Sequence, residues 1–305
     1  MSRKITARIP ASTTNLGPGF DVLGLALKLY STITLEITEN DTEVVVTGVD
    51  ADKIPSSTEN VAFQAVKHIY TRSGTPLPNG LKISISNGIP AIRGLGGSGT
   101  AILGGMLTAN ASCGNPFTNK EILDFASAIE GHPDNVAASL YGGLVISMQE
   151  NEHIHTIKLH CDPSLHIVLA IPDFTLSTKK ARDILPKSVD FKDAIYNISR
   201  SSLLIASIAT GNLDNLSIAM TDRLHQPYRS SLIPGFDDVV NAAISAGAKS
   251  IALSGAGPTI AAYCLENSEN VGIQMHNAFK NHNINSEIKV LTSDLDGAVV
   301  TTNHD

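Results

Sequence analysis

A glycine-rich segment in the first third of the chain constrains the fold most strongly. It runs from Pro90 to Thr100, and its sequence PAIRGLGGSGT has four glycines within six positions. Glycine lets the backbone approach a ligand closely and turn several N–H groups toward it. The segment follows strand alternation at Leu81–Ser86 and precedes helical spacing that begins near Ile102. Because a helix N-terminus attracts anions, this order predicts a phosphate-binding loop.

Two familiar nucleotide motifs do not account for this segment. Gly94-x-Gly96-x-x-Gly99 matches the dinucleotide fingerprint, but Pro90 separates the glycines from the strand, and the nearest downstream acid, Glu121, belongs to a predicted helix cap. No Gly-Lys-Ser/Thr follows, so the segment is not a P-loop. A flexible loop without a ligand is the remaining alternative, and the amphipathic stretch that follows argues against it.

Strand-like and helix-like stretches alternate along the chain without an internal repeat, which predicts an α+β fold. The polar stretch Gln149–Glu152 suggests a boundary between an N-terminal domain, residues 1–150, and a C-terminal domain, residues 151–305. Thr118 and Glu121 form a capping-box pattern that opens a helix toward Glu130. The other predicted strands and helices follow the two periodicities. The strands are 4–9, 32–37, 43–49, 81–86, 166–171, 250–253, 259–264 and 286–291, and the helices are 60–70, 191–210, 236–246 and 270–281.

The net charge indicates which binding partners are unfavourable, and the cysteines indicate the redox state of the compartment. The 29 acidic residues exceed the 22 basic ones, which argues against nucleic acid or an anionic membrane as a partner. Cys113, Cys161 and Cys264 lie far apart and form no CxxC pair, as expected of reduced thiols. No apolar run is long enough to cross a membrane, and the first residues do not resemble a secretory signal. These features predict a cytoplasmic protein.

A second segment, Glu130-Gly-His-Pro-Asp-Asn135, gathers two carboxylates, an imidazole and an amide within six residues. Phosphoryl transfer needs oxygen ligands for Mg²⁺, typically a carboxylate and a hydroxyl. Glu130 and the Ser98 hydroxyl could supply these two ligands. An ordinary solvated helix end would produce the same residues, and the sequence alone leaves both interpretations open.

Two further segments could shape a ligand site. Leu253–Thr259, LSGAGPT, is a small-residue turn between predicted strands, and in isolation a simple hairpin would explain it. Pro10–Asp21, PASTTNLGPGFD, is predicted to be a shaped loop directly after the first strand. Asn15 and Asp21 could bind an ammonium or hydroxyl group there, although Asx residues in turns most often bond their own backbone.

In combination, these segments resemble the GHMP kinase superfamily and, within it, the homoserine kinases. PAIRGLGGSGTA corresponds to the family's phosphate loop of the form P-x-x-x-G-L-G-S-S-A, and PASTTNLGPGFDVLGLAL, EGHPDNVAASLYGG and LSGAGPT follow the family's other motifs. Their order spans residues 10–259. The resemblance implies a two-domain GHMP kinase fold, with an N-terminal domain like domain 2 of ribosomal protein S5 and a ferredoxin-like C-terminal domain. It also implies transfer of the ATP γ-phosphate to L-homoserine, giving O-phospho-L-homoserine in threonine biosynthesis.

The resemblance assigns residues to each part of that reaction. Ser98 and Glu130 would hold Mg²⁺, and together with Asn135 they would be the catalytic residues. ATP would be bound by Asn60, Pro90, Arg93, Gly94, Leu95, Gly96, Gly97, Ser98, Gly99 and Thr100. The amino acid would be bound by Asn15, Asp21, His132, Asn135, Thr178, Arg182, Arg229 and Gly255. Within that set, Asp21 would take the ammonium, and the two arginines would take the carboxylate. For either arginine, an exposed surface charge is the alternative.

The sequence departs from the family pattern in the phosphate loop. Gly97 replaces the first serine of the usual pair, and Gly99 replaces the following alanine, which predicts a more flexible loop and weaker nucleotide binding. Asn135, or the adjacent Asp134, stands where related kinases place an aspartate near the acceptor hydroxyl. With Asn135 there, catalysis would rest on positioning and charge stabilisation.

Two other functions remain open at this point. One is a kinase of the same superfamily that acts on another small alcohol, and the other is a non-catalytic ATP-binding sensor. Retention of both Ser98 and Glu130 argues against the sensor. Family analogy also suggests a homodimer.

Overall fold

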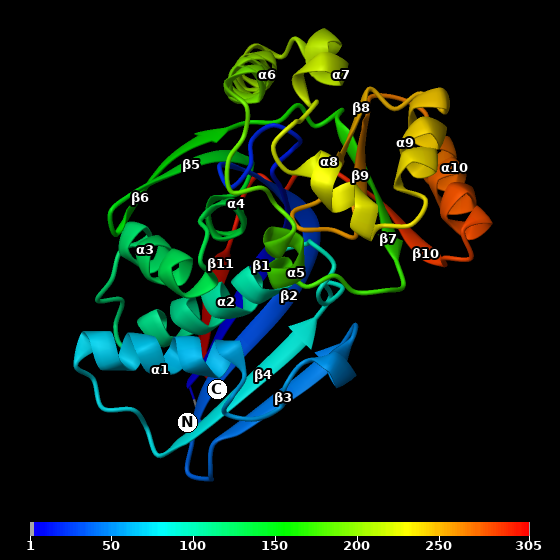
Figure 1. Ribbon diagram of the computed structural model, residues 1–305. Coiled ribbons are helices and arrows are strands. Elements are labelled where there is room, and N and C mark those ends of the chain that lie inside the picture. The colour runs from blue at the N-terminus through cyan, green and yellow to red at the C-terminus, as the bar shows by residue number, and fades with distance from the viewer. Residues whose placement is uncertain (1–2, 305) are drawn as a thin grey trace.

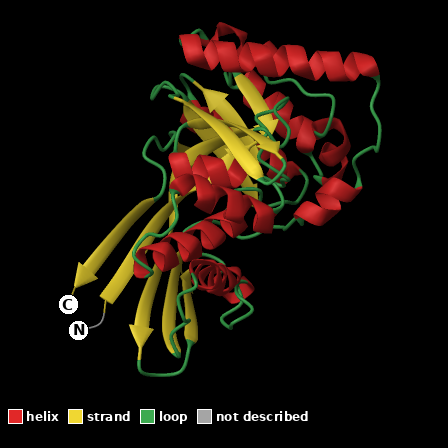
Figure 2. Cartoon of the chain, turned by 90° about the vertical axis from the view of Figure 1, so that its left-hand side faces the viewer, coloured by secondary structure: helices red, strands yellow, loops and turns green. Residues whose placement is uncertain are grey.

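The computed structural model describes residues 3–304, which form two lobes that each contain a β-sheet (Figure 1). Within these residues, the larger sheet has seven strands in the order β11-β1-β2-β4-β3, with β5 paired to β2 and β6 paired to β5. The smaller sheet has four strands in the order β10-β7-β9-β8. Figure 2 shows helices packed on both sheets and one long helix, α6, along the outside of the second lobe.

Each predicted strand and helix corresponds to an observed element, although the strand predicted at 32–37 extends back to Leu23 and the helix Asp134–Tyr141 was not predicted. The strands are β1 (Arg3–Thr14), β2 (Leu23–Thr38), β3 (Glu43–Gly48), β4 (Gly80–Asn87), β5 (Leu144–Glu150), β6 (His153–Leu159), β7 (His166–Pro172), β8 (Ser250–Leu253), β9 (Ile260–Cys264), β10 (Ser286–Leu291) and β11 (Val299–His304). The α-helices are α1 (Val61–Ser73), α2 (Gly97–Ser112), α3 (Asn119–Glu130), α4 (Asp134–Tyr141), α5 (Thr178–Asp183), α6 (Phe191–Thr210), α7 (Leu216–Ala219), α8 (Gln226–Arg229), α9 (Phe236–Ser245) and α10 (Ser268–Asn281). Short 3₁₀ turns lie at Ala51–Lys53, Leu213–Asn215 and Ser230–Leu232.

Two local predictions are wrong. The residues Pro10–Thr14 were expected to form a loop, but they continue β1, because a register shift between Pro10 and Ala11 accommodates the proline and pairing with β2 resumes beyond it. The helix after the glycine-rich segment was expected to begin near Ile102, but it begins at Gly97. The last four residues of the glycine-rich segment, Gly97–Thr100, are therefore the first turn of a helix rather than a loop.

One face of the large sheet is apolar and the other is polar, as expected for a largely antiparallel sheet with one solvated side. In β1, Ala7 and Ile9 are buried and face a core that also contains residues of α1, α2, α3 and α4. The alternate residues Thr6 and Thr34 are partly exposed, and their hydroxyls hydrogen-bond across the strands at 3.0 Å. The helices therefore cover a single face of this sheet.

The two lobes share a hydrophobic core. The start of β2, Leu23–Leu27, is buried at every position, and its leucines pack in one cluster with residues of β7, β9 and α6. β7 is apolar on both faces, because Ile167 and Leu169 face this shared core while Val168 and Ala170 face α9 and α10. The shared core holds the lobes against each other and places the ends of β1 and β2 beside the second lobe.

The smaller sheet confirms the expected ferredoxin-like arrangement. Its strands and main helices follow in the order β7, α9, β8, β9, α10, β10, and each pair of neighbouring strands is antiparallel. The large sheet takes β6 and β11 from beyond residue 150, so both parts of the chain contribute to it. A division of the chain at residue 150 stays a prediction. None of the helices within residues 3–304 combines the length and apolar character needed to span a membrane.

Candidate active site

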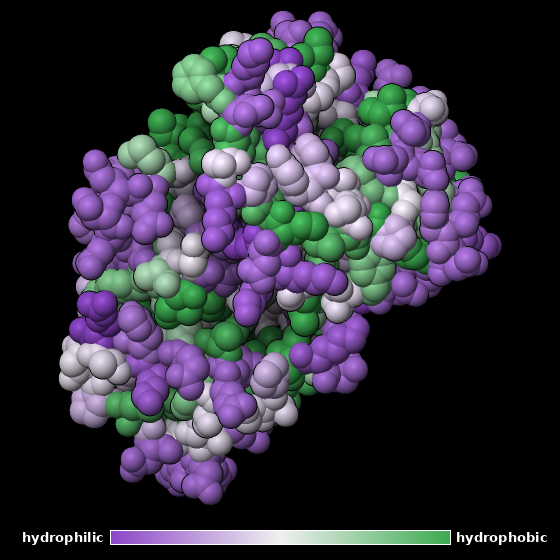
Figure 3. Space-filling model, viewed as in Figure 1, coloured by the Kyte–Doolittle hydropathy of each residue, from purple (hydrophilic) through white to green (hydrophobic). Residues whose placement is uncertain are grey.

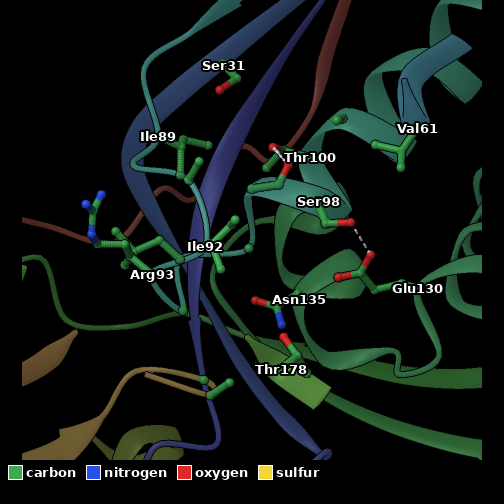
Figure 4. Close-up of a pocket in the computed structure, with 18 of the residues that line it drawn as sticks. Ser31, Val61, Ile89, Ile92, Arg93, Ser98, Thr100, Glu130, Asn135 and Thr178 are labelled. Atoms are coloured by element: carbon green, nitrogen blue, oxygen red, sulfur yellow. Dashed lines mark hydrogen bonds between the residues drawn. The ribbon is translucent and has the colours of Figure 1, made fainter. Parts of the chain in front are cut away.

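A cavity of about 380 Å³ lies between the lobes and collects residues from all four predicted segments. It opens at the hollow in the middle of the surface shown in Figure 3, where apolar side chains are visible below a polar rim. In Figure 4, Ser31, Ile89 and Val61 lie at one end of the cavity, and Asn135 and Thr178 lie at the other. Ser98 and Glu130 lie between the two ends.

The N-terminus of α2 offers a binding site for an anion. Gly96 is the N-cap residue at φ 74°, and no side chain caps the helix, so the N–H groups of its first turn remain available to a ligand. A Cβ atom on Gly96 would lie 2.4 Å from Ser12 Oγ and 2.9 Å from Asn135 Oδ1. Only glycine fits this position, because both the backbone conformation and the close approach exclude a side chain.

Ser98 and Glu130 meet at the centre of the cavity. Ser98 Oγ donates a hydrogen bond to Glu130 Oε2 at 2.8 Å (Figure 4). α3 places this carboxylate, since its capping box at Thr118 and Glu121 fixes the start and Gly131 ends the helix directly after Glu130. Burial raises the pKa of Glu130, although the Ser98 hydrogen bond and nearby His132 oppose that shift. A carboxylate whose charge is poorly compensated suits a cation.

These two side chains fit the requirements of Mg²⁺. The ion prefers oxygen ligands and, beside nucleotide phosphates, needs only one or two protein ligands. Among the residues that the structure describes, no group of three or more His, Cys, Asp or Glu side chains could hold a metal ion without a nucleotide. A hydroxyl and one carboxylate beside an anion-binding helix end therefore match a metal held jointly with phosphates. The assignment of Ser98 and Glu130 as its ligands stays a prediction.

Asp21 and Arg182 form a bidentate ion pair across the other end of the cavity. Arg182 donates from both terminal nitrogens, at 2.9 Å to Asp21 Oδ2 and 2.8 Å to Oδ1. Asp21 comes from the loop between β1 and β2, where its φ is 58°, and Arg182 comes from α5 in the second lobe. Both side chains are about one-third exposed. Each of these two predicted ligands thus neutralises the other before any substrate binds.

Arg229 is buried beside this ion pair, which excludes an exposed surface charge at this position. It is 2% exposed, and it donates to the backbone carbonyl oxygens of Ala181 and Gly255 at 2.9 and 3.2 Å. Burial and the nearby charge of Arg182 lower its pKa to about 10, so it stays cationic near neutral pH. Its guanidinium carbon lies 5.0 Å from the centre of the Phe20 ring. Among the residues that the structure describes, its one side-chain hydrogen-bond partner is His225 Nδ1, at 3.5 Å, and a buried cation without a carboxylate partner that lines a cavity suits an anionic ligand.

Hydrogen bonds among His132, Asp134, Asn135 and Ser12 determine which polar groups face the cavity. Asp134 is 1% exposed, and its Oδ1 lies 2.8 Å from His132 Nδ1 and accepts from the Asn135 N–H at 2.9 Å. Although burial opposes it, the Asp134 carboxylate raises the pKa of His132. Asn135 Oδ1 accepts from Ser12 Oγ at 2.9 Å, which leaves its NH₂ group to donate. Asp134 is thus committed to its neighbours, and Asn135 presents an amide to the cavity.

The opening loop and the third glycine motif lie side by side. Asn15 donates to the Gly255 carbonyl at 2.9 Å, and its own carbonyl oxygen accepts from the Asp21 N–H at 3.0 Å. Asn15 is 2% exposed, so both ends of its amide hold the loop in shape. The Gly94 carbonyl accepts from Ser254 Oγ at 2.7 Å, which joins the phosphate loop to the same motif. Contacts of Asn15 and Gly255 with a substrate stay predictions.

Of the remaining predicted residues, Asn60, Leu95 and Thr178 line the cavity and Pro90 does not. Asn60 caps α1 and donates to the Pro55 carbonyl at 2.6 Å, so its side chain shapes the wall of the cavity. Leu95 is buried in the shared core, and Pro90 is also buried. Thr178 is exposed at the first turn of α5 and points toward Asn135 at the same end of the cavity in Figure 4. Contacts of these four residues with ATP or the amino acid stay predictions.

The sequence predictions missed the apolar wall of the cavity. It is formed by side chains from β2, β4, α1 and the loops beside them, namely Ile33, Ile54, Pro55, Val61, Ile85, Ile89 and Ile92. No local motif marks most of these residues: Ile33, Ile85 and Val61 follow ordinary strand or helix periodicity, and Ile54, Pro55 and Ile89 lie in loops. Ile92 is the exception, since it lies inside the glycine-rich segment and was passed over between Pro90 and Arg93.

The two unusual glycines of the phosphate loop have space for a side chain. A Cβ on Gly99 would lie 3.5 Å from Val136 Cγ2, which is ordinary contact, and one on Gly97 would come no closer than 3.9 Å to Ile89. We expect Gly99→Ala to stabilise the protein by about 1 kcal/mol through helix propensity and a less flexible unfolded chain. In thermal unfolding, Tm would rise by roughly 2–4 °C.

A matched substitution in the same helix provides the control. Gly105 also lies in α2, but a Cβ there would come within 2.3 Å of the Ala62 carbonyl oxygen. Gly105→Ala is therefore expected to lower Tm. A fall in Tm for both variants would mean that Gly99 is required by packing.

Comparisons with known proteins agree with this geometry. The family descriptions "GHMP kinases N terminal domain" and "GHMP kinases C terminal" match residues 60–143 and 204–282. The homoserine kinase of Moorella thermoacetica is 44% identical over 293 residues, which cover 96% of this chain and 98% of that protein. The homoserine kinase of Synechocystis is 41% identical over 300 residues, covering 97% and 98%.

Solved structures give the same result. The crystal structure of homoserine kinase from Cytophaga hutchinsonii has a TM-score of 0.87 and 30% identity, and the match covers 98% of this chain and 97% of that one. Mevalonate kinase of L. major in complex with R-mevalonate has a TM-score of 0.72 at 16% identity, covering 95% and 96%, which shows a shared fold. The chain belongs to the GHMP kinase family and, within it, to the homoserine kinases.

Proposed function

We propose that this protein transfers the γ-phosphoryl group of Mg·ATP to the hydroxyl of L-homoserine and releases O-phospho-L-homoserine and ADP. The observation that carries the proposal is the charge pattern at one end of the cavity. Asp21, Arg182 and Arg229 lie together there, close to the anion-binding end of α2. One carboxylate and two guanidinium groups complement a zwitterionic amino acid, whose side-chain hydroxyl would then point toward the phosphates.

The ion pair between Asp21 and Arg182 suggests how the amino acid enters. Its ammonium would replace Arg182 on the Asp21 carboxylate, and its carboxylate would bind the released Arg182 together with Arg229. Each charge that loses a partner gains another, so the exchange leaves no charge unpaired in a partly buried site. A ligand with only one of the two charges would leave either Asp21 or the arginines without compensation.

The residues around the acceptor support catalysis by positioning. Asn135 offers an amide, and Asp134 already accepts two hydrogen bonds, so neither is placed to act as a strong base. Phosphoryl transfer with a loose transition state needs little early proton removal, and alignment of the hydroxyl supplies much of the rate. Mg²⁺, held by Ser98 and Glu130, would neutralise charge on the β- and γ-phosphates. The first-turn N–H groups of α2 would stabilise the same phosphates.

Two alternatives make different predictions. A kinase for another small alcohol would have no use for the Asp21, Arg182 and Arg229 set if its acceptor were uncharged. A non-catalytic sensor would have no reason to keep the contact between Ser98 and Glu130, which is intact at 2.8 Å. Both alternatives are therefore less well supported than a homoserine kinase.

An ADP-release assay with Mg·ATP tests the proposal. The acceptors are L-homoserine, mevalonate, galactose, shikimate, and two homoserine analogues that lack one charge, 4-hydroxybutyrate and 3-amino-1-propanol. We expect turnover with L-homoserine and at least about 100-fold lower kcat/KM with either analogue, since each analogue leaves a charged group unpaired. Turnover with another acceptor alone would support the second alternative. ATP binding without turnover on any acceptor would favour the sensor.

The cellular setting follows from weaker observations. Cys113, Cys161 and Cys264 are all free thiols, consistent with a reducing compartment, and we place the reaction in the cytoplasm. The net charge argues against nucleic acid and anionic membranes as partners. A homodimer remains a prediction from the family resemblance.

A further inference from the structure

Ile92 has an unfavourable backbone conformation inside the phosphate loop. Its φ is 57°, in the left-handed region that β-branched residues rarely adopt. Most other non-glycine residues with positive φ in the described part of the chain are Asn or Asp, which tolerate this region, and Leu16 is the other apolar one. Ile92 is also 54% exposed, although its side chain is large and apolar. A strained, exposed isoleucine at a ligand site points to a function for its side chain.

Neighbouring contacts hold Ile92 in this conformation from both sides. The Ala91 N–H donates to Asp50 Oδ2 at 3.0 Å, and the Ile92 carbonyl accepts from the Leu176 N–H at 3.3 Å. Arg93 is 7% exposed and bonds Asp50 Oδ2 from one terminal nitrogen at 3.0 Å. Its other two nitrogens donate to the carbonyls of Asp173 and Phe174, at 3.1 and 3.2 Å.

Arg93 therefore acts as a clamp rather than as a free cation. All three of its guanidinium nitrogens bond the protein, and its side chain points away from the middle of the cavity in Figure 4. The clamp ties the phosphate loop to the turn after β3 and to the loop after β7 in the second lobe. Three of its five N–H donors are used in these bonds, and a contact of Arg93 with ATP stays a prediction.

The Ile92 side chain lines the cavity described above. It lines the cavity together with Ile89 and Val61, and Figure 4 shows it between Ile89 and the N-terminus of α2. The phosphates would lie at that helix end, so the neighbouring apolar space suits the base and ribose of the nucleotide. An exposed isoleucine gains contacts only when that space is filled.

We propose that Ile92 is a nucleotide-contacting residue, held in a strained conformation by the Arg93 clamp so that its side chain packs against the nucleoside part of ATP. The inference rests on the proposed use of ATP at this site, but not on the identity of the acceptor. The strain is present in the empty protein, whereas the apolar contact forms only with nucleotide bound. Relief of the strain and loss of the contact should therefore change stability and affinity in opposite directions.

Two substitutions of Ile92 separate these effects. Ile92→Asn accepts the left-handed conformation but lacks the apolar side chain, so we expect Tm of the ligand-free protein to rise by about 2 °C. Its Kd for Mg·ATP, measured by calorimetry without an acceptor, should rise at least about 10-fold. Ile92→Val keeps the β-branched strain and removes one methylene, so Tm should stay within about 1 °C and Kd should rise about fourfold.

The controls identify the cause of any change. Asn151 has φ 56° in the exposed turn between β5 and β6, and Asn151→Gly should leave Kd for Mg·ATP unchanged. An unchanged Kd in both Ile92 variants overturns the proposal, whether Tm rises or falls. A lower Tm for Ile92→Asn also overturns it, because the side chain would then serve packing in the empty protein. Since binding is measured without an acceptor, failure of the homoserine assay would not affect this test.

Discussion

Replacing Glu130 by Gln is expected to lower kcat with Mg·ATP and L-homoserine at least about 10³-fold, because metal stabilisation of the transferring phosphoryl group is worth several kcal/mol. Glutamine has the same shape and can still accept the hydrogen bond from Ser98 Oγ, which spans 2.8 Å in the structure. Burial raises the pKa of Glu130, so its charge is not what stabilises this part of the empty protein. The thermal unfolding transition should therefore stay close to that of the unchanged protein.

Steady-state kinetics and thermal unfolding of Glu130→Gln test this expectation together. Glu121→Gln is a matched control, because Glu121 lies on the same helix and its carboxylate bonds only Thr118 in the capping box. The control should lose about 1 kcal/mol of stability or less and keep its kcat. A near-normal kcat in Glu130→Gln would remove Glu130 from the metal site, and an unfolded variant would show that its role is structural.

Replacing Arg182 by Met is expected to raise KM for L-homoserine about 10- to 100-fold, the value of a charge-assisted hydrogen-bond pair. KM for Mg·ATP should change about twofold or less, because the Arg182 guanidinium bonds Asp21 rather than a residue of the phosphate loop. Methionine preserves the length and apolar character of the stem and removes only the guanidinium. The loss of the ion pair with Asp21 should cost little stability, since both side chains are about one-third exposed.

The control for Arg182 is another arginine of the second lobe. Arg223 pairs with Asp193 at 3.0 Å, is 51% exposed, and does not line the cavity. Arg223→Met should therefore leave both KM values unchanged. If Arg182→Met raised KM for ATP more than KM for homoserine, the assignment of Arg182 to the substrate carboxylate would be wrong.

Local patterns in the sequence were enough to predict most secondary-structure elements. Phe191–Thr210 was predicted as a helix and is α6, and the capping box at Thr118 and Glu121 is formed. These predictions succeed because helix and strand periodicities depend on residues within a few positions of one another. The errors lie at Pro10 and Gly97, where a strand register shift and a helix N-terminus accept residues that usually interrupt regular structure.

The site was predicted from four separate motifs, and the structure brings their main residues to one cavity. Ser98 and Glu130 are 32 positions apart and in contact, as predicted for a shared metal. Their contact depends on the packing of α2 against α3, which no local pattern specifies. The resemblance to a family predicted this contact, because members of a family share the arrangement of the whole fold.

By itself, the sequence determined the order of strands and helices, the anion-binding character of Gly94–Thr100, and the family to which the chain belongs. The tertiary structure decided which charges are committed to partners. Asp21 is paired with Arg182, the Arg93 guanidinium bonds Asp50 and two backbone carbonyls, and Arg229 is buried without a carboxylate. The physical reason is that burial and charge pairing depend on segments that are distant in the chain. A side chain's type is fixed locally, but its partners, exposure and pKa are set by the packed lobes around it.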